Sequence, residues 1–128
     1  MHVNNKKMAT LTPTLTLAST DYGSDALNFT VTDSLTTGEP TTGISRQSIA
    51  TGSAQDVLAS NSAFSYLYIQ NISSTNAAAF IQVKLGGNAV IRLDVGEFAF
   101  VPMYSGLTVQ AEAYTAACVL EFAQFSKA

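Results

Sequence analysis

Few side chains in this sequence have the types and spacing that catalysis or metal binding needs. His2 is the single histidine and Cys118 the single cysteine among the 128 residues. A Ser-His-Asp triad, a Cys-His pair or a histidine-based zinc site would have to use His2, which lies in a polar segment at the start of the sequence. One cysteine makes no internal disulfide, and Cys118 stands in an alternating apolar run that predicts a buried, inert thiol. We therefore expect no enzyme, no cofactor and no bound transition metal.

The nine acidic residues leave two further possibilities for chemistry. Glu112 and Glu121 fall on neighbouring predicted strands and could point the same way, as the carboxylate pair of a glycosidase must. Asp21 and Asp25 could offer oxygen ligands to calcium, although their spacing matches no known calcium loop. The simpler interpretation of all four is a solvated, outward-facing position, with calcium as the one ion left open.

A stacking platform for sugars or bases could be built from four tyrosines, which are Tyr66, Tyr68, Tyr104 and Tyr114. Phe64 shares a predicted strand face with the first two of them, and this favours burial in a core or a subunit interface. Gly86-Gly87 lacks the lysine and the following helix of a phosphate-binding loop, and a hairpin turn explains it fully.

The elements that would position these residues are β-strands. Apolar and polar residues alternate with a period of two in four runs, at residues 81–85, 91–95, 107–113 and 118–123. Turns are predicted at Gly86-Gly87-Asn88 and at residues 94–97. Pro102 is expected to end the run 98–101, because proline has no N–H for the ladder. Phe98 and Phe100 share a face of that run and are predicted to be core residues.

The first half of the chain is less regular. Leu11, Leu15 and Leu17 share one face of a predicted strand at residues 10–18, and Pro13 places this segment at a sheet edge or in an extended arm. Leu27, Phe29 and Val31 alternate in a second strand, and residues 44–51 form a third. Residues 33–43 are expected to be a loop or crossover. Residues 52–63 leave a short helical turn around 56–59 or a loop open.

Strands of this length and spacing predict an all-β fold, an antiparallel β-sandwich of eight or nine strands and most simply a jelly roll. Residues 1–8 are expected to be a disordered leader or a cloning remnant, and residues 9–128 one sandwich domain with an extended N-terminal segment at about 9–20. The predicted core consists of Leu27, Phe29, Leu67, Ile69, Ile81, Val83, Ile91, Leu93, Leu107, Val109, Leu120 and Phe122.

Composition excludes some partners. Charged residues make up 12% of the chain and the net charge is −3, which argues against sequence-independent nucleic-acid binding through a Lys/Arg surface. No apolar run approaches the roughly 18 residues of a membrane span, and the polar N-terminus lacks the apolar stretch of a signal peptide. We expect neither nucleic acid nor membrane as a partner.

The second half of the chain resembles the small virion structural proteins of tailed bacteriophages, especially capsid decoration (cement) and related head-associated proteins. The resemblance runs from about Ile44 to Ala128. It rests on YLYIQN at 66–71, the turn SSTNAA at 73–78, the hairpin IQVKLGG at 81–87, VGEFAFVP at 95–102 and the strand GLTVQA at 106–111. Viral jelly rolls and other sandwiches share such patterns, and the resemblance brings no active-site residues with it.

The resemblance implies a non-enzymatic protein on the virion surface, made in the bacterial host cytoplasm, that stabilises the shell by bridging major capsid subunits, often as a homotrimer. The alternative is a ligand- or carbohydrate-binding module of a virion fibre or tail. For the self-interface we expect contributions from Leu11, Pro13, Leu15, Leu17, Phe64, Tyr66 and Tyr68.

Overall fold

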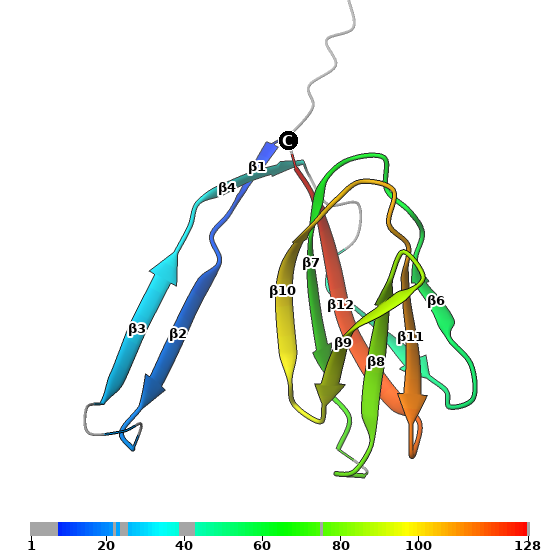
Figure 1. The fold of residues 1–128 in the computed structure, drawn as a ribbon. Coiled ribbons are helices and arrows are strands. Elements are labelled where there is room, and N and C mark those ends of the chain that lie inside the picture. The colour runs from blue at the N-terminus through cyan, green and yellow to red at the C-terminus, as the bar shows by residue number, and fades with distance from the viewer. Residues whose placement is uncertain (1–7, 22, 24–25, 39–42, 75, 128) are drawn as a thin grey trace, which may run out of the picture. The chain divides into compact units, whose positions relative to one another are not determined.

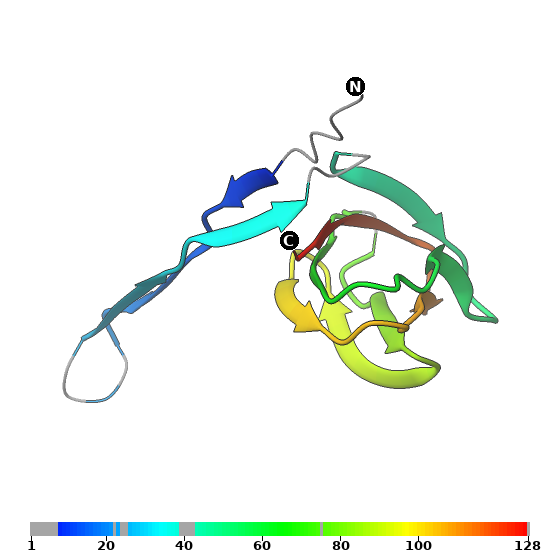
Figure 2. The ribbon, with the colours of Figure 1, turned by 90° about the horizontal axis from the view of Figure 1, so that it is seen from above.

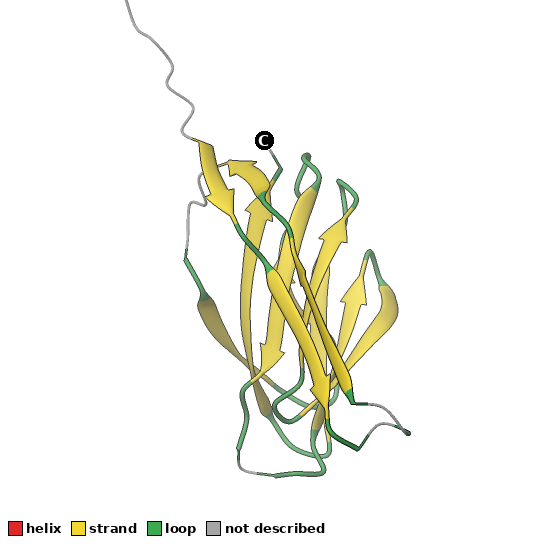
Figure 3. Ribbon diagram, turned by 90° about the vertical axis from the view of Figure 1, so that its left-hand side faces the viewer, coloured by secondary structure: helices red, strands yellow, loops and turns green. Residues whose placement is uncertain are grey.

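The computed structural model describes residues 8–21, 23, 26–38, 43–74 and 76–127. Within these residues it contains strands and connecting loops but no helix (Figure 3). Every strand pairing is antiparallel, apart from one isolated parallel bridge. The predicted all-β, antiparallel fold is thus confirmed. Of the leader expected at residues 1–8, residues 1–7 with His2 lie outside the described residues, as does Asp25, whereas Met8 is the first residue of a strand, β1 (Met8–Leu11).

Two compact units divide the chain, one with the first four strands and one with the other eight. The first unit is a two-stranded ribbon, visible as a narrow band in Figure 2. In it β1 (Met8–Leu11) pairs with β4 (Leu35–Gly38), and β2 (Thr14–Ser19) pairs with β3 (Leu27–Thr32). The expected N-terminal segment at 9–20 is therefore half of a hairpin whose other half is residues 27–38.

Two details of this ribbon differ from the sequence expectation. The strand predicted at residues 10–18 is interrupted at Thr12 and Pro13, because proline cannot donate to the ladder; its carbonyl still accepts a hydrogen bond from the amide of Asp33 at 3.2 Å. The loop predicted at residues 33–43 was wrong for Leu35–Gly38, which forms β4. That segment has threonines at its centre, and β1 supplies the partner strand that a short threonine-rich segment needs.

The second unit is a sandwich of two four-stranded sheets (Figure 1). The first sheet has the order β10-β7-β12-β5, and its strands are β5 (Ser45–Ile49), β7 (Ser65–Asn71), β10 (Phe98–Met103) and β12 (Cys118–Ser126). The second sheet has the order β6-β11-β8-β9, and its strands are β6 (Gln55–Leu58), β8 (Phe80–Leu85), β9 (Asn88–Asp94) and β11 (Val109–Tyr114). The chain changes sheet at every connection except the hairpin between β8 and β9.

The sandwich corrects two further expectations. Residues 55–58 form the strand β6 on the edge beside β11, neither a helical turn nor a loop. Pro102 does not end its run, since β10 continues to Met103. The physical reason is that β10 is an edge strand, where a residue without an N–H can be accommodated.

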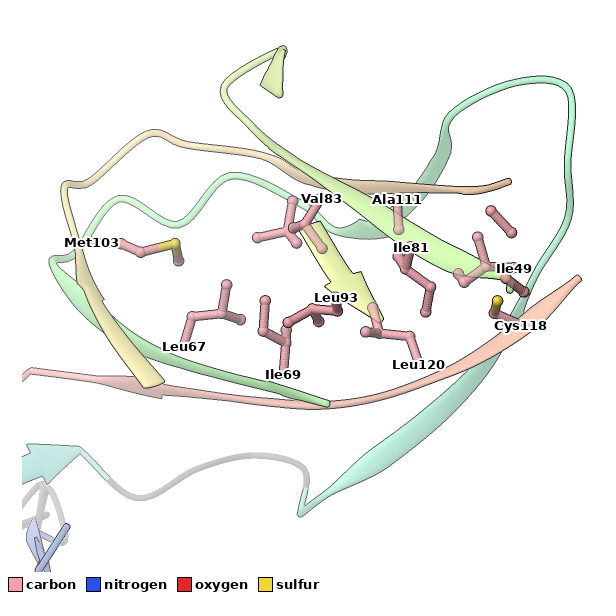
Figure 4. Packing of buried hydrophobic residues seen from close by; sticks show 13 residues of the cluster. Ile49, Leu67, Ile69, Ile81, Val83, Leu93, Met103, Ala111, Cys118 and Leu120 are labelled. Carbon is pink, nitrogen blue, oxygen red and sulfur yellow. The ribbon is translucent and has the colours of Figure 1, made fainter. Parts of the chain in front are cut away.

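The core lies between the two sheets and is drawn in Figure 4. Seven predicted core residues are buried there, namely Leu67, Ile69, Ile81, Val83, Leu93, Val109 and Leu120, and Ile91, Leu107 and Phe122 pack against them with partial exposure. Cys118 is also buried, as predicted. The prediction was wrong for Phe29, which is 50% exposed, and for half-buried Leu27. Both belong to the ribbon, which has no second sheet of its own to cover them.

The hairpin between β8 and β9 turns at Gly86-Gly87, as predicted. Both glycines have positive φ, at 61° and 85°, which is the requirement of a two-residue type I′ turn. A Cβ on Gly86 would lie 2.9 Å from Cδ2 of Leu107, whereas one on Gly87 would meet nothing within 4 Å. The backbone thus favours glycine at both positions, and at position 86 an added Cβ would also require the side chain of Leu107 to shift.

Candidate functional site

The burial pattern along strand β7 shows which face of the first sheet is exposed to solvent. Leu67 and Ile69 are fully buried, and the alternating Tyr66 and Tyr68 are half-exposed on the opposite face. On β10 the residues Ala99 and Val101 pack against the core, so Phe98 and Phe100 also point outward. The prediction that these two phenylalanines are core residues was wrong, and Phe98 is 62% exposed.

Aromatic residues consequently collect on the outer side of the first sheet. We call this surface the aromatic face and define it as Tyr66, Tyr68, Phe98, Phe100, Pro102 and Phe125. Cross-strand pairing places Tyr66 between Pro102 and Phe125, and Tyr68 beside Phe100. The rings of Tyr66 and Phe100 stack, with centroids 5.8 Å apart and planes 10° from parallel. The result is a surface rich in aromatic side chains, with Gln70 opposite Phe98, where soluble sandwiches usually carry mostly polar side chains.

A shallow groove of about 230 Å³ lies beside the aromatic face and is lined by Phe64, Pro102, Met103, Tyr104 and Lys127. The rings of Phe64 and Tyr104 have centroids 5.9 Å apart and are tilted by 54°. The ammonium group of Lys127 is 5.0 Å from the ring centroid of Tyr66 and 5.8 Å from that of Phe64, within the range of cation–π attraction. The groove therefore combines exposed rings with one positive charge.

Charge is scarce on the first sheet. Its four strands contain two charged residues, Arg46 and Glu121, whose Nε and Oε2 atoms are 3.1 Å apart. The hydroxyl of Tyr68 lies 2.8 Å from Oε1 of Glu121. Burial, followed by this hydrogen bond and the nearby negative charge, raises the pKa of Tyr68 to about 12. The same hydrogen bond lowers the pKa of Glu121, with Arg46 assisting. The three groups satisfy one another and leave no unpaired charge on the strands of this face.

The outer face of the second sheet has a different chemistry. Its strands carry five charged residues, which are Asp56, Lys84, Arg92, Asp94 and Glu112. Its one aromatic pair, Phe80 and Tyr114, stacks at 4.8 Å and is capped by the guanidinium of Arg92, 3.8 Å from the Phe80 ring. This face is suited to water, whereas the aromatic face is not.

The predicted carboxylate pair is not assembled. Glu112 is on β11 of the second sheet and Glu121 on β12 of the first, and each alternates with buried neighbours. The two carboxylates thus point away from each other on opposite sides of the sandwich. The expectation that they could face the same way was wrong, because residues 109–114 and 118–126 pair with different strands.

The ribbon carries a second apolar surface. Leu15 pairs with Val31 and Leu17 with Phe29, and we call these four residues the apolar ladder. They are 41–50% exposed. On the other face Thr14 faces Thr32 and Thr16 faces Thr30, with hydroxyl oxygens 3.2 and 3.3 Å apart.

Four of the seven tentative interface residues fall on these two surfaces. Leu15 and Leu17 belong to the apolar ladder, while Leu11, opposite Leu35, and Pro13 are half-buried elsewhere in the ribbon. Tyr66 and Tyr68 lie on the aromatic face, and Phe64 lines the groove beside it. The residues missed by sequence reasoning are Pro102, Phe125 and Lys127. The run Phe98–Met103 is apolar at every position, so its alternation did not tell inside from outside.

Neither a metal cluster nor a membrane helix is found in the parts of the chain that the structure describes. No group of three or more His, Cys, Asp or Glu side chains there could hold a metal ion. No helix among the same residues is long and apolar enough to cross a membrane.

Comparison with protein-family models, with curated proteins and with solved structures found no match for this chain.

Proposed function

We propose that this chain is a non-enzymatic structural protein of a tailed-bacteriophage virion, made in the host cytoplasm and bound to the capsid surface, where it bridges major capsid subunits. The observation that carries the proposal is the pair of exposed apolar surfaces, the apolar ladder and the aromatic face. The sequence resemblance to capsid decoration proteins supports the same role.

The chemistry of both surfaces favours association with protein over catalysis. The strands of the ribbon contain no charged residue, and the two charged residues on the strands of the first sheet are paired. Removing charge from water is the expensive part of burying a surface, so these surfaces can be covered at low desolvation cost. Large exposed apolar patches on a small protein typically mark interaction sites.

We also infer that the sandwich is a jelly roll of eight strands. The inference rests on the alternation of the chain between the two sheets from β5 to β12, interrupted by a single hairpin within one sheet. Jelly rolls are common in viral shells, and a trimer would match the points where three shell subunits meet.

The proposal is tested on virus particles. Particles from a lysate that produces this chain would be purified on a density gradient, and the gradient fractions probed with an antiserum against the chain. We expect the chain to sediment with filled shells, to be released by mild denaturant, and to rebind when the purified chain is added back. A chain that stays at the top of the gradient in both experiments would contradict the proposed role.

A second candidate function is carbohydrate binding by a fibre or tail module, and the groove beside the aromatic face favours it. Exposed rings such as Tyr104, which is 77% exposed, can stack against a sugar, and Lys127 could attract an acidic one. A glycan array probed with the full chain tests this. Specific binding that Tyr104→Ala abolishes, and that Val90→Ala on the second sheet leaves intact, would support it, whereas an array without signal would oppose it.

A further inference from the structure

We infer that the apolar ladder of one chain docks on the aromatic face of a second copy of the same chain. This inference rests on the proposed assembly role and names the partner of its two surfaces. Each such contact joins two different surfaces. Repeated around a ring the contact is heterologous, whereas in a reciprocal pair two of these contacts form one isologous, two-fold interface.

The ribbon needs a covering surface. A two-stranded ribbon is at best marginally stable in water, because each strand has one neighbour and one face stays solvated. Here that face carries Leu15, Leu17, Phe29 and Val31, each about half exposed. The threonine pairs on the other face are already linked and suit water. The apolar ladder is therefore the side that gains from a partner.

The aromatic face has the matching chemistry. It presents Phe98 and the stacked rings of Tyr66 and Phe100, and Arg46 and Glu121 at its far side neutralise each other. Lys127 adds one positive charge at its edge, 5.0 Å from the ring centroid of Tyr66. The outer face of the second sheet would instead place the uncharged ladder against five charged residues, of which Arg92 and Asp94 form an ion pair. The lower cost of removing charge from water thus favours the first sheet.

The area of the two surfaces favours a partner copy that both inserts its own ribbon and accepts the ribbon of the first chain. The ribbon has ten cross-strand pairs, so one of its faces measures about 34 Å by about 10 Å, or about 340 Å². A copy that only inserts its ribbon would bury that area alone. In a reciprocal pair each chain also receives its partner's ribbon and buries about 680 Å² in one interface, close to the roughly 800 Å² per partner of a stable interface. A ring would divide the same area between two neighbours, so the area favours the reciprocal pair.

The test uses light scattering after size exclusion on the full chain at about 10–50 µM, a range in which ordinary assembly interfaces persist. We expect an oligomer. Leu17→Asp should raise the concentration for half-dissociation at least about tenfold, because it buries a carboxylate. Its matched control is Thr16→Asp, on the opposite face of the same strand, which should leave the mass unchanged. For the aromatic face the pair is Phe98→Asp and Val90→Asp, at exposed positions on the two sheets.

A mixing experiment tests the pairing itself. Leu17→Asp keeps an intact aromatic face and Phe98→Asp keeps an intact ribbon, so an equimolar mixture can form one of the two contacts. The mixture should therefore half-dissociate at a lower concentration than either variant alone, but at a higher one than the wild type. Circular dichroism would establish that both variants are folded. If Leu17→Asp unfolds the ribbon, Phe98→Asp still tests the contact, because its substitution lies in the sandwich and leaves the ribbon unchanged.

Each other outcome overturns the inference. A monomeric wild-type chain excludes docking on a second copy, and the chain would then cover its ladder by itself or on another protein. An oligomer that both Asp variants leave intact, or a mixture that associates no better than the separate variants, would reject the pairing of ladder with aromatic face. A monomer that still sediments with shells would reject this inference while sparing the proposed function.

Discussion

Val83 and Val90 offer a matched test of the sandwich core, since the same substitution can be made on both strands of one hairpin. Val83 on β8 is fully buried, whereas Val90 on β9 is 59% exposed. Each Val→Ala change removes two carbon groups, worth about 0.8 kcal/mol each when fully buried. Val83→Ala loses this whole amount, about 1.6 kcal/mol, and leaves a cavity that brings the cost to about 2–3 kcal/mol.

Val90→Ala loses at most the buried two-fifths of that transfer energy, about 0.7 kcal/mol, and leaves no cavity. Both changes remove a β-branched side chain from a strand, so the propensity loss largely cancels in the comparison. Urea denaturation at equilibrium, followed by circular dichroism, gives both free energies of unfolding if the slope with urea is unchanged. Equal losses for the two variants would refute the assignment of Val83 to the inner face and Val90 to the outer one.

Three more predictions concern single residues. Gly86→Ala should lower the free energy of unfolding by about 1–2 kcal/mol more than Gly87→Ala, since both have positive φ but only the first meets Leu107; equal losses in urea denaturation would contradict this. Absorbance titration near 295 nm should show a tyrosine that ionises at about pH 12 and disappears in Tyr68→Phe, and a spectrum complete by pH 11 would rule it out. Because the folded pKa of Glu121 is lowered, its stabilising effect is present above the ordinary glutamate pKa of about 4.3 and is lost as pH falls through the folded value. The difference in unfolding free energy between wild type and Glu121→Gln should therefore shrink toward pH 3, and a difference independent of pH would disprove the coupling.

Local pattern was sufficient wherever a segment had one apolar and one polar face. The alternation in residues 81–85, 91–95 and 118–122 placed the inner face of those strands correctly, because a strand in a two-layer sandwich has one buried side. The glycine pair at 86–87 likewise determined its hairpin, since few other residues take positive φ at low cost. The lack of helical periodicity excluded helices in the described parts of the chain.

Tertiary structure alone decided the segments whose pattern is ambiguous. The run Phe98–Met103 is apolar throughout, and its inner face became defined only by pairing with β7, whose tyrosines point outward. Leu35–Gly38 and Gln55–Leu58 look like loops because short threonine-rich or polar segments form strands only when a partner strand is in register. Glu112 and Glu121 are nine positions apart, and it is the change of sheet between β11 and β12 that separates them. Phe29 has the pattern of a core residue, yet the second layer that would cover it is absent from its two-stranded ribbon. Alternation specifies that a side chain is to be buried, whereas the partner that buries it is set by long-range pairing.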